Sequence, residues 1–220
     1  DLERKLERDR GRLGENDCAI ADACFKLGEF YRQQDRHCEA EERYLEALRI
    51  YGLVEGEGSE SVAMVSCNLG NVYKAQGRLD DALRMHKRAL RLSRRLYGGE
   101  HPQVAASLTN VGIILHEKGE LEGAMVKYEK AHAMFVRLHG EDHLDAAVVL
   151  GNMATVLKDQ GRDAEEMTME EKVLDIRRRT LGSDHDHVAT SLLNLGLAYD
   201  EQGLYEDALV RYKEGLGIVR

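Results

Sequence analysis

The sequence predicts an all-α fold in which antiparallel helix pairs stack into a solenoid. Three observations carry this prediction: an internal repeat of 42 residues, apolar residues at helical spacing within each repeat, and a single proline among 220 residues. Because proline is the residue that a helix interior tolerates least, its scarcity favours long, uninterrupted helices. A fixed period of about 20 to 50 residues is typical of proteins built from stacked helical or sheet repeats.

Three ladders of residues establish the period. One lies at a turn within each repeat, one at a joint between repeats, and one inside the first helix of each repeat, here called helix A. The turn ladder is Asp35, Gly77, Gly119, Gly161 and Gly203; the joint ladder is Gly14, Gly56, Gly98, Gly140 and Gly182; the helix A ladder is Leu27-Gly28, Leu69-Gly70, Val111-Gly112, Met153-Ala154 and Leu195-Gly196. Glycine fits turn and joint because it adopts the left-handed conformation that often ends a helix.

The ladders divide the chain into a single array. Residues 1–16 match the second helix (helix B) of a preceding repeat with its joint, and five repeats follow at 17–58, 59–100, 101–142, 143–184 and 185–220. Because the chain starts inside a repeat and without Met, we expect it to be part of a longer protein. Apolar residues at steps of three and four, such as Val104, Leu108 and Val111, define the buried helix faces.

Local signals predict how the helices begin and cross. The acidic segments after the joint glycines are expected to cap the next helix A, and Pro102 to lie in a first helical turn. The glycine of each Leu-Gly pair costs helix stability, so we expect it to allow close approach of the helix B backbone. The fourth repeat departs from the pattern: Asp163, Glu166 and Glu170 replace apolar, small and aromatic residues of helix B, which predicts looser packing or an outside contact.

These residues resemble a known family. The positions that carry the resemblance are Leu69-Gly70, Tyr73, Gly77, Leu79, Ala82 and Ala89, with Tyr44, Tyr128 and Tyr212 at the large position of helix B and Ala40, Ala82 and Ala208 at the small one. They reproduce the tetratricopeptide repeat pattern. The 42-residue period, the Gly-x-Asp-His joint and the Asn-Leu-Gly run resemble kinesin light chain and its relatives. The resemblance implies a right-handed superhelix whose A helices line a concave groove that binds protein segments.

Composition excludes several function classes. The net charge of −9 argues against nucleic acid as the main partner. The apolar runs are far shorter than the roughly 20 residues of a membrane-spanning helix. The cysteines Cys18, Cys24, Cys38 and Cys67 lack the spacing of a zinc site, which favours reduced thiols in a cytoplasmic protein. We expect no cofactor and no bound metal.

Catalysis is not expected either. The run Asp184-His185-Asp186-His187 resembles an acid–base or metal cluster, but it lies at a joint between repeats, where a capping role is favoured. The glycines are spaced for turns and helix crossings and form no phosphate-binding loop.

The candidate binding residues lie on helix A. One position holds Asn68, Asn110, Asn152 and Asn194, with Lys26 in the first repeat. Asparagine is a poor residue inside a helix, and its amide can both donate to and accept from the backbone of an extended peptide. The resemblance implies the same role for such groove asparagines; the alternative is that they bond neighbouring helices. Further along helix A come Asn71 and a basic ladder of Arg32, Lys74, His116 and Lys158, which ends at Asp200 and suits acidic groups on a partner.

The sequence therefore predicts an adaptor or scaffold that binds short extended peptide segments in its groove. Two alternatives stay open. The array could be the sensor of a larger multidomain signalling protein, or it could assemble end to end through open helix faces, because the last helix carries Leu209, Leu216, Ile218 and Val219 with little to cover them.

Overall fold

The computed structural model describes residues 2–14 and 16–219, with the side chains of residues 2, 5, 9 and 13 left out. Within this part the chain forms eleven α-helices and no strand. The all-α solenoid prediction is confirmed, because consecutive helices pack against one another in chain order within each of two compact units, Asp1–Lys118 (unit 1) and Gly119–Arg220 (unit 2).

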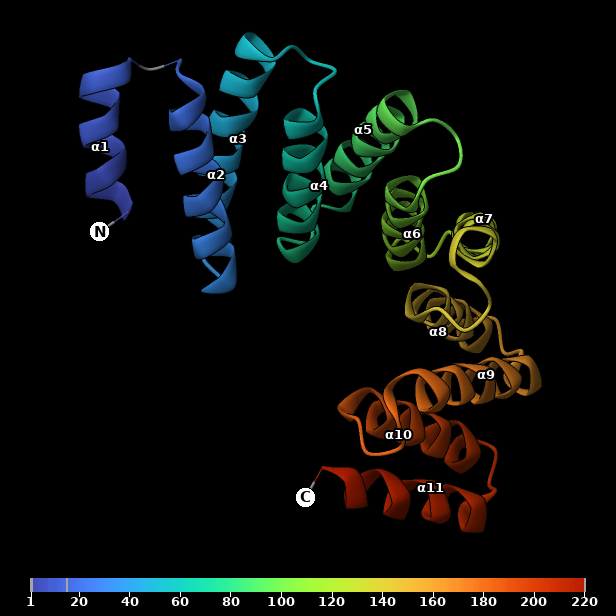
Figure 1. Ribbon diagram of the computed structural model, residues 1–220. Helices are drawn as coiled ribbons and strands as arrows, with labels where there is room; N and C mark the ends of the chain where they lie inside the picture. Colours follow the sequence, from blue (N-terminus) through green and yellow to red (C-terminus); the bar gives the residue numbers. More distant parts are fainter. Residues whose placement is uncertain (1, 15, 220) are drawn as a thin grey trace. The chain divides into compact units, whose positions relative to one another are not determined.

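Unit 1 contains six helices, which lie side by side (Figure 1). They are α1 (Leu2–Leu13), α2 (Cys18–Gln33), α3 (His37–Val54), α4 (Glu60–Ala75), α5 (Leu79–Tyr97) and α6 (Pro102–Glu117). The pairs α2–α3 and α4–α5 pack most extensively, as the two helices of one repeat should. Helices α2, α4 and α6 are A helices, and their side chains directed away from the B helices form what we call the A-helix face.

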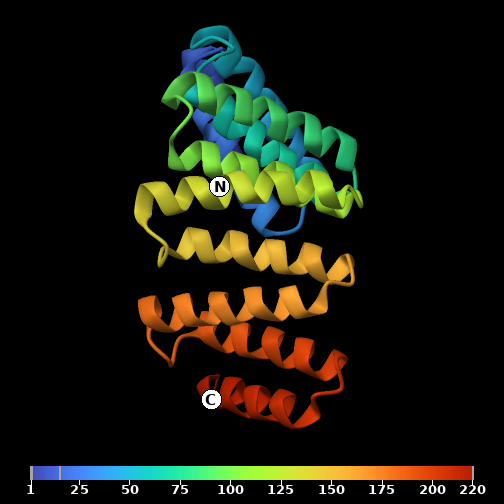
Figure 2. The ribbon, with the colours of Figure 1, turned by 90° about the vertical axis from the view of Figure 1, so that its right-hand side faces the viewer.

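Unit 2 contains five helices, which Figure 2 shows in one row. They are α7 (Leu121–His139), α8 (Leu144–Asp159), α9 (Asp163–Leu181), α10 (Asp186–Glu201) and α11 (Tyr205–Ile218). The A helices of this unit are α8 and α10. The boundary between the units falls in the turn between α6 and α7, inside the predicted repeat 101–142. The single array and the limits of its repeats remain predictions.

The predicted turns and joints have the backbone that glycine favours. Every turn and joint glycine of the two ladders has a positive φ, between 68° and 93°. Asp35, which replaces glycine in the first turn, has a φ of 57° and is the one non-glycine residue in this region within the described chain. An aspartate tolerates this conformation better than most residues, which explains why the ladder can hold it.

The caps of the A helices differ from the prediction at three joints. Histidine, not an acidic residue, is the N-cap: the Nδ1 atoms of His101, His143 and His185 accept hydrogen bonds from the backbone N–H two residues later, at 3.1–3.2 Å. Asp17 and Ser59 cap α2 and α4. The acidic residues were a misleading signal because a neutral imidazole nitrogen accepts the same bond. Pro102 is at the start of α6, as predicted.

The crossing of helices A and B also differs from the prediction. A Cβ added to Gly28 would lie 2.7 Å from the Tyr44 ring, and one added to Gly196 would lie 2.6 Å from the Tyr212 ring. The Leu-Gly glycine therefore makes room for an aromatic side chain of helix B rather than for its backbone. Close backbone approach occurs instead at Gly215 of α11, where an added Cβ would lie 3.3 Å from the carbonyl oxygen of Ala189.

The fourth repeat keeps a full-length helix B despite its acidic residues. Helix α9 spans 19 residues, and Glu166 and Glu170 are 7 % and 6 % exposed. Two carboxyl groups therefore lie where other repeats bury small or aromatic side chains. Burial raises the pKa of both, that of Glu170 to about 7, although Arg177 acts in the opposite direction on Glu170.

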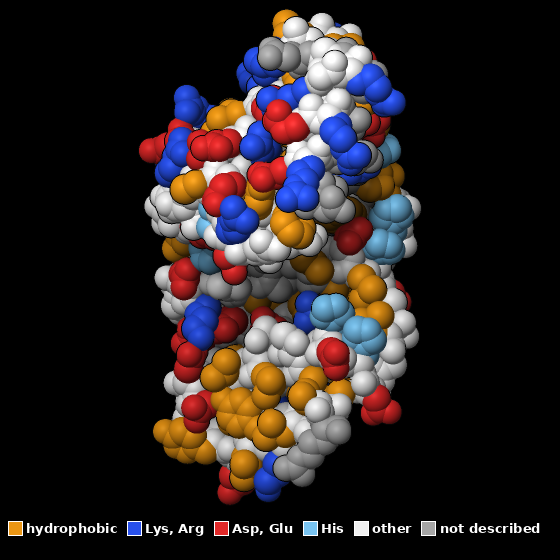
Figure 3. Space-filling view, turned by 90° about the vertical axis from the view of Figure 1, so that its left-hand side faces the viewer, with side chains coloured by type: hydrophobic (Ala, Val, Ile, Leu, Met, Phe, Trp, Pro, Cys, Tyr) orange, Lys and Arg blue, Asp and Glu red, His pale blue; other side chains and the backbone are white. Residues whose placement is uncertain are grey.

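The last helix of unit 2 leaves apolar side chains uncovered. Hydrophobic side chains gather over the lower helices in Figure 3. On α11, Leu209, Val210 and Leu216 are 51 %, 57 % and 55 % exposed, and Val219, directly after the helix, is 65 % exposed. Within the described residues no helix combines the length and apolar character needed to cross a membrane.

Candidate functional site

The predicted binding residues all lie on A helices. Unit 1 holds Asn68, Asn71 and Lys74 on α4 and Asn110 on α6. These four side chains are half-buried. The position of each on helix A is the one that the 42-residue spacing predicts.

A cavity of about 240 Å³ in unit 1 brings two of them together. Asn68 and Asn110 line it from α4 and α6, and Ala89, Ser93 and Tyr97 line it from α5. The Asn68 amide makes no side-chain hydrogen bond within the described part of the chain. Small-molecule pockets usually have volumes of roughly 300–1,000 Å³, so this cavity is better matched to one side chain of a partner than to a cofactor.

Asn110 has a partner inside the protein. Its Nδ2 atom donates to Sγ of Cys67, at 3.3 Å, and so joins α6 to α4. Burial raises the pKa of the Cys67 thiol, and the bond from Asn110 lowers it by less. A thiol is a weak acceptor, so this bond leaves the Asn110 carbonyl oxygen, a stronger hydrogen-bonding group, for another donor.

The two predicted lysines are paired with glutamates. Lys74 lies 3.2 Å from Glu117 in unit 1, and Lys158 lies 2.6 Å from Glu201 in unit 2. In both cases the glutamate lies 43 residues after the lysine, on the A helix of the next repeat. Because these pairs are partly exposed, each contributes little stability, but an acidic group on a partner would have to compete with the glutamate.

Unit 2 presents its own A-helix face. Asn152 is half-buried on α8, and Asn194 is exposed on α10. Gly151 precedes Asn152, and a Cβ added there would meet no atom within 4 Å. Gly151 therefore leaves open space around its α carbon.

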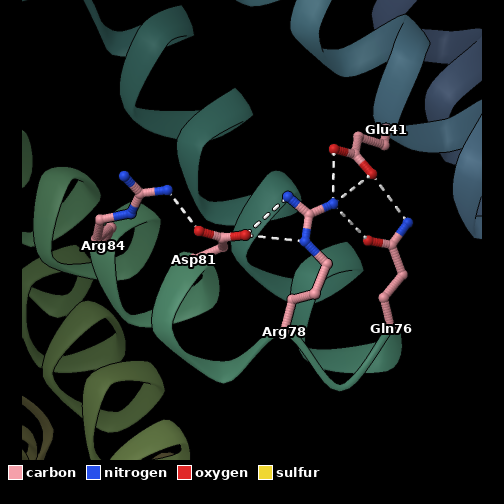
Figure 4. A network of polar contacts seen from close by, with 5 residues as sticks. All are labelled: Glu41, Gln76, Arg78, Asp81 and Arg84. Carbon is pink, nitrogen blue, oxygen red and sulfur yellow. Dashed lines mark hydrogen bonds and ion pairs between the residues drawn. The ribbon is translucent and has the colours of Figure 1, made fainter.

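An arginine network at the turns was missed by sequence reasoning. Arg78, the residue after the turn glycine Gly77, bonds Glu41 of α3 at 2.9 Å and Asp81 of α5 at 2.7 Å (Figure 4). Its guanidinium carbon lies 4.3 Å from the centre of the Tyr73 ring. Arg36 repeats the arrangement over Tyr31, at 4.4 Å. The sequence signal that could have revealed this network is an arginine that recurs directly after the turn position. This arginine ties the turn to the neighbouring helices.

A larger cavity in unit 2 was also not foreseen. It measures about 430 Å³ and lies on the B-helix side, lined by α7 and α9 residues such as His132, Lys172 and Arg179. One of its charged groups, Arg179, is paired within the protein, 2.9 Å from Asp142 and 2.6 Å from Asp175. Burial lowers the pKa of His132.

The remaining candidates for reactive groups are the cysteines and the Asp184–His187 run. The four cysteines are free thiols. His185, the second residue of the Asp-His-Asp-His run, caps α10, as the capping interpretation requires. The described residues contain no group of three or more histidine, cysteine or acidic side chains arranged to hold a metal ion.

Comparison with known proteins agrees with the geometry. Models of the tetratricopeptide repeat match residues 17–94, 61–135 and 171–220, and a second model of that repeat matches residues 147–187. No protein of curated function matches the sequence.

Solved structures with the same fold are distant in sequence. BtubC (BKLC) from P. vanneervenii superposes with a TM-score of 0.82 at 24 % identity, over 99 % of this chain and 87 % of that one. A kinesin light chain of Podosopora anserina with nearly identical TPR-like repeats has a TM-score of 0.76 at 20 % identity, over 92 % and 96 % of the two chains. The apo form of RapI has a TM-score of 0.76 at 18 % identity, over 99 % and 58 %.

These matches settle the family. The helix pairs, the ladders of small residues and the repeat models agree over most of the chain, and the fold is that of a protein-interaction scaffold. The chain belongs to the tetratricopeptide repeat family and has the fold of its kinesin light chain-like members.

Proposed function

We propose that the protein is an adaptor that binds an extended segment of a partner protein on its A-helix face. The observation that carries the proposal is the cavity between α4 and α6, because it places Asn68 and Asn110 around a space of about 240 Å³. A side chain of the partner fills this space, and the two amides hydrogen-bond the main chain on either side of it.

Main-chain recognition explains why the asparagines recur while their neighbours vary. Position 67 of α4 holds cysteine, whereas the positions 42 and 84 residues later hold Thr109 and Gly151. The varied position selects the partner's side chains, and the constant amide holds the backbone between them. The likeness to kinesin light chain repeats supports the adaptor role, and the four free thiols fit the cytoplasm.

The test starts from a displayed library of random ten-residue peptides selected on the full chain. Replacing Asn68 and Asn110 by alanine should weaken the selected peptides about tenfold, the effect of losing about 1.4 kcal/mol of hydrogen bonding. Asn16→Ala is the matched control, because Asn16 lies at a joint, where it accepts a bond from Arg49 at 2.8 Å. A library that yields no binding peptide, or peptides indifferent to both asparagines, would contradict the proposal.

A further inference from the structure

The fourth repeat replaces an aromatic ring by a carboxyl group. Tyr44, His86 and Tyr212 are spaced by multiples of 42 residues, and each packs its ring on a helix A glycine. The same register position in α9 is Glu170, and the facing position in α8 is Ala154. The change thus affects both helices of the pair.

One carboxylate oxygen of Glu170 has no hydrogen-bond partner in the described part of the protein. Its side chain is buried, with the residue 6 % exposed, and its Oε2 atom has no hydrogen-bond partner within the described residues. Arg177 is the cation that acts on it, but the Arg177 guanidinium already donates to Ser191 Oγ at 2.7 Å and to the His187 carbonyl oxygen at 3.3 Å. An unsatisfied buried carboxylate is costly, so it marks a place where an additional cation would be stabilising.

The first repeat indicates from which side such a cation would enter. There the Phe25 ring of α2 packs on the Tyr44 ring, with 5.6 Å between the centroids. The residues at the corresponding positions of the fourth repeat are Gly151 and Glu170. Because an added Cβ at Gly151 would meet no atom within 4 Å, the side chain that covers Tyr44 in the first repeat has no counterpart over Glu170.

The charges near Glu166 and Glu170 favour a positive group. Glu166 and Glu170 lie on α9, and Glu201 of α10 and Asp163 add negative charge at Glu166. The opposing cations are Lys158, which is paired with Glu201, and Arg177, which is bonded to α10. The carboxyl groups in this cluster thus outnumber the cations by four to two.

We propose that the A-helix face of unit 2 accepts a lysine or arginine side chain of the bound segment, which passes over Gly151 and pairs with the free carboxylate oxygen of Glu170. This rests on the proposed function and names the partner's chemistry at one position. Either residue has a long apolar stem that can lie across Gly151, and its charged head supplies the hydrogen bonds that Oε2 lacks. The preference is opposite to the acidic one that Lys158 predicts from the sequence.

Binding of this kind depends on pH. The incoming cation pairs with the ionised form of Glu170, whose pKa burial raises to about 7. Affinity should therefore be greatest at pH 8 and fall about tenfold towards pH 6, as the carboxylate becomes protonated. Glu166, Glu201, Asp163, Lys158 and Arg177 are the other charged groups that act on this pair of carboxyl groups.

The same random peptide library tests the proposal, with selection on the full chain at pH 8. One position of the selected peptides should hold lysine or arginine, and replacing that residue by norleucine should weaken binding at least about tenfold. Glu170→Gln should cause the same loss for the lysine peptide and little loss for the norleucine peptide, whereas Gly151→Leu obstructs the stem and should weaken both peptides. Glu171→Gln is the matched control, because it removes the same charge from an exposed neighbour on α9.

The outcomes separate this inference from the proposed function. If the selected peptides lack a basic residue but depend on Asn68 and Asn110 for binding, the proposed pairing with Glu170 is wrong and the adaptor function is supported. The pocket proposal would also be wrong if a peptide with the basic residue bound the Glu170→Gln variant as tightly as it binds the natural chain. If no peptide is selected at all, both proposals are wrong.

Discussion

The ring of His86 fills the space that a side chain on Gly70 would need: an added Cβ would lie 2.6 Å from Nε2 of the imidazole. Gly28 and Tyr44 show the same relationship. Glycine is unfavourable inside a helix, and these pairs explain why it is kept. Where the ring is replaced by Glu170, the glycine is replaced by Ala154.

Gly70→Ala should therefore destabilise the protein. The new methyl group has to displace a buried ring that is held by α4 and α5, and overpacking of this kind costs about 1–3 kcal/mol. Gly151→Ala is the control, because Gly151 also lies inside an A helix but has open space around it. There the gain in helix propensity should stabilise the protein by about 0.5–1 kcal/mol. Urea unfolding measures both; equal effects of the two substitutions would show that the ring does not select glycine.

His86 should make the protein sensitive to acid. Burial lowers the pKa of the imidazole to about 4, with a smaller contribution from Lys74. Since the unfolded chain takes up this proton near pH 6.5 and the folded one only near pH 4, stability falls as the pH drops between these values. The loss at pH 5 is about 2 kcal/mol. His86→Tyr, which introduces the residue that the first, third and fifth repeats hold at this position, should reduce the stability difference between pH 7 and pH 5 by that amount. An unchanged difference would place the acid sensitivity elsewhere.

The helices and turns could be predicted from the sequence because each depends on residues that are close together in the chain. Apolar spacing and the glycine ladders predict the helices of every repeat, and positive φ at the glycines follows from their position alone. Contacts between repeats were less accessible. The pairing of Lys74 with Glu117 joins residues 43 apart, and the cavity beside Asn68 depends on how two A helices are separated. Neither is encoded within one period.

A second group of differences arose because more than one side chain can do the same chemistry. An imidazole caps a helix as an aspartate does, so the sequence of the joint could not show that His101, and not Glu100, is the N-cap. Glu170 was recognised as an exception, yet only its surroundings reveal that one of its oxygens has no partner.

Glu170→Gln should stabilise the protein, and more so at high pH. The folded pKa of about 7 lies above the ordinary value of 4.5, so the folded state holds the proton more tightly than the unfolded chain. The favourable contribution is complete below pH 4.5 and is lost as the pH rises towards 7. At pH 8 the ionised group costs about 3 kcal/mol, which the amide avoids. Urea midpoints should differ most at pH 8 and converge near pH 5; a constant difference would contradict the buried ionisation.

Histidine capping predicts a distinct pattern at the start of α8. His143→Ala removes the acceptor for the Asp145 N–H and should cost about 1 kcal/mol. His143→Asn keeps a capping oxygen but loses the stacking on His139, whose ring centroid lies 4.4 Å away. If the cap is the main contribution, the asparagine variant should retain most of the stability in urea unfolding. Equal losses in the two variants would assign the effect to the ring contact instead.

The apolar surface of α11 predicts self-association of a particular geometry. Leu209 and Leu216 are seven residues apart and so share one helix face, and both are more than half exposed. The exposed side chains of α1 at Glu3, Arg4, Glu7 and Arg8 are charged, so they offer no apolar surface for α11 of another copy. Contact between two copies of α11 is symmetric and closes at a dimer, whereas contact between α11 and α1 would form open chains.

Sedimentation equilibrium should therefore give a mass that rises with concentration and stops at twice that of the monomer. Replacing Leu209 and Leu216 by glutamate should hold the protein as a monomer, while Leu53→Glu, at an exposed site of α3, should not. Growth beyond the dimer, or a dimer that survives the glutamates, would contradict contact through α11.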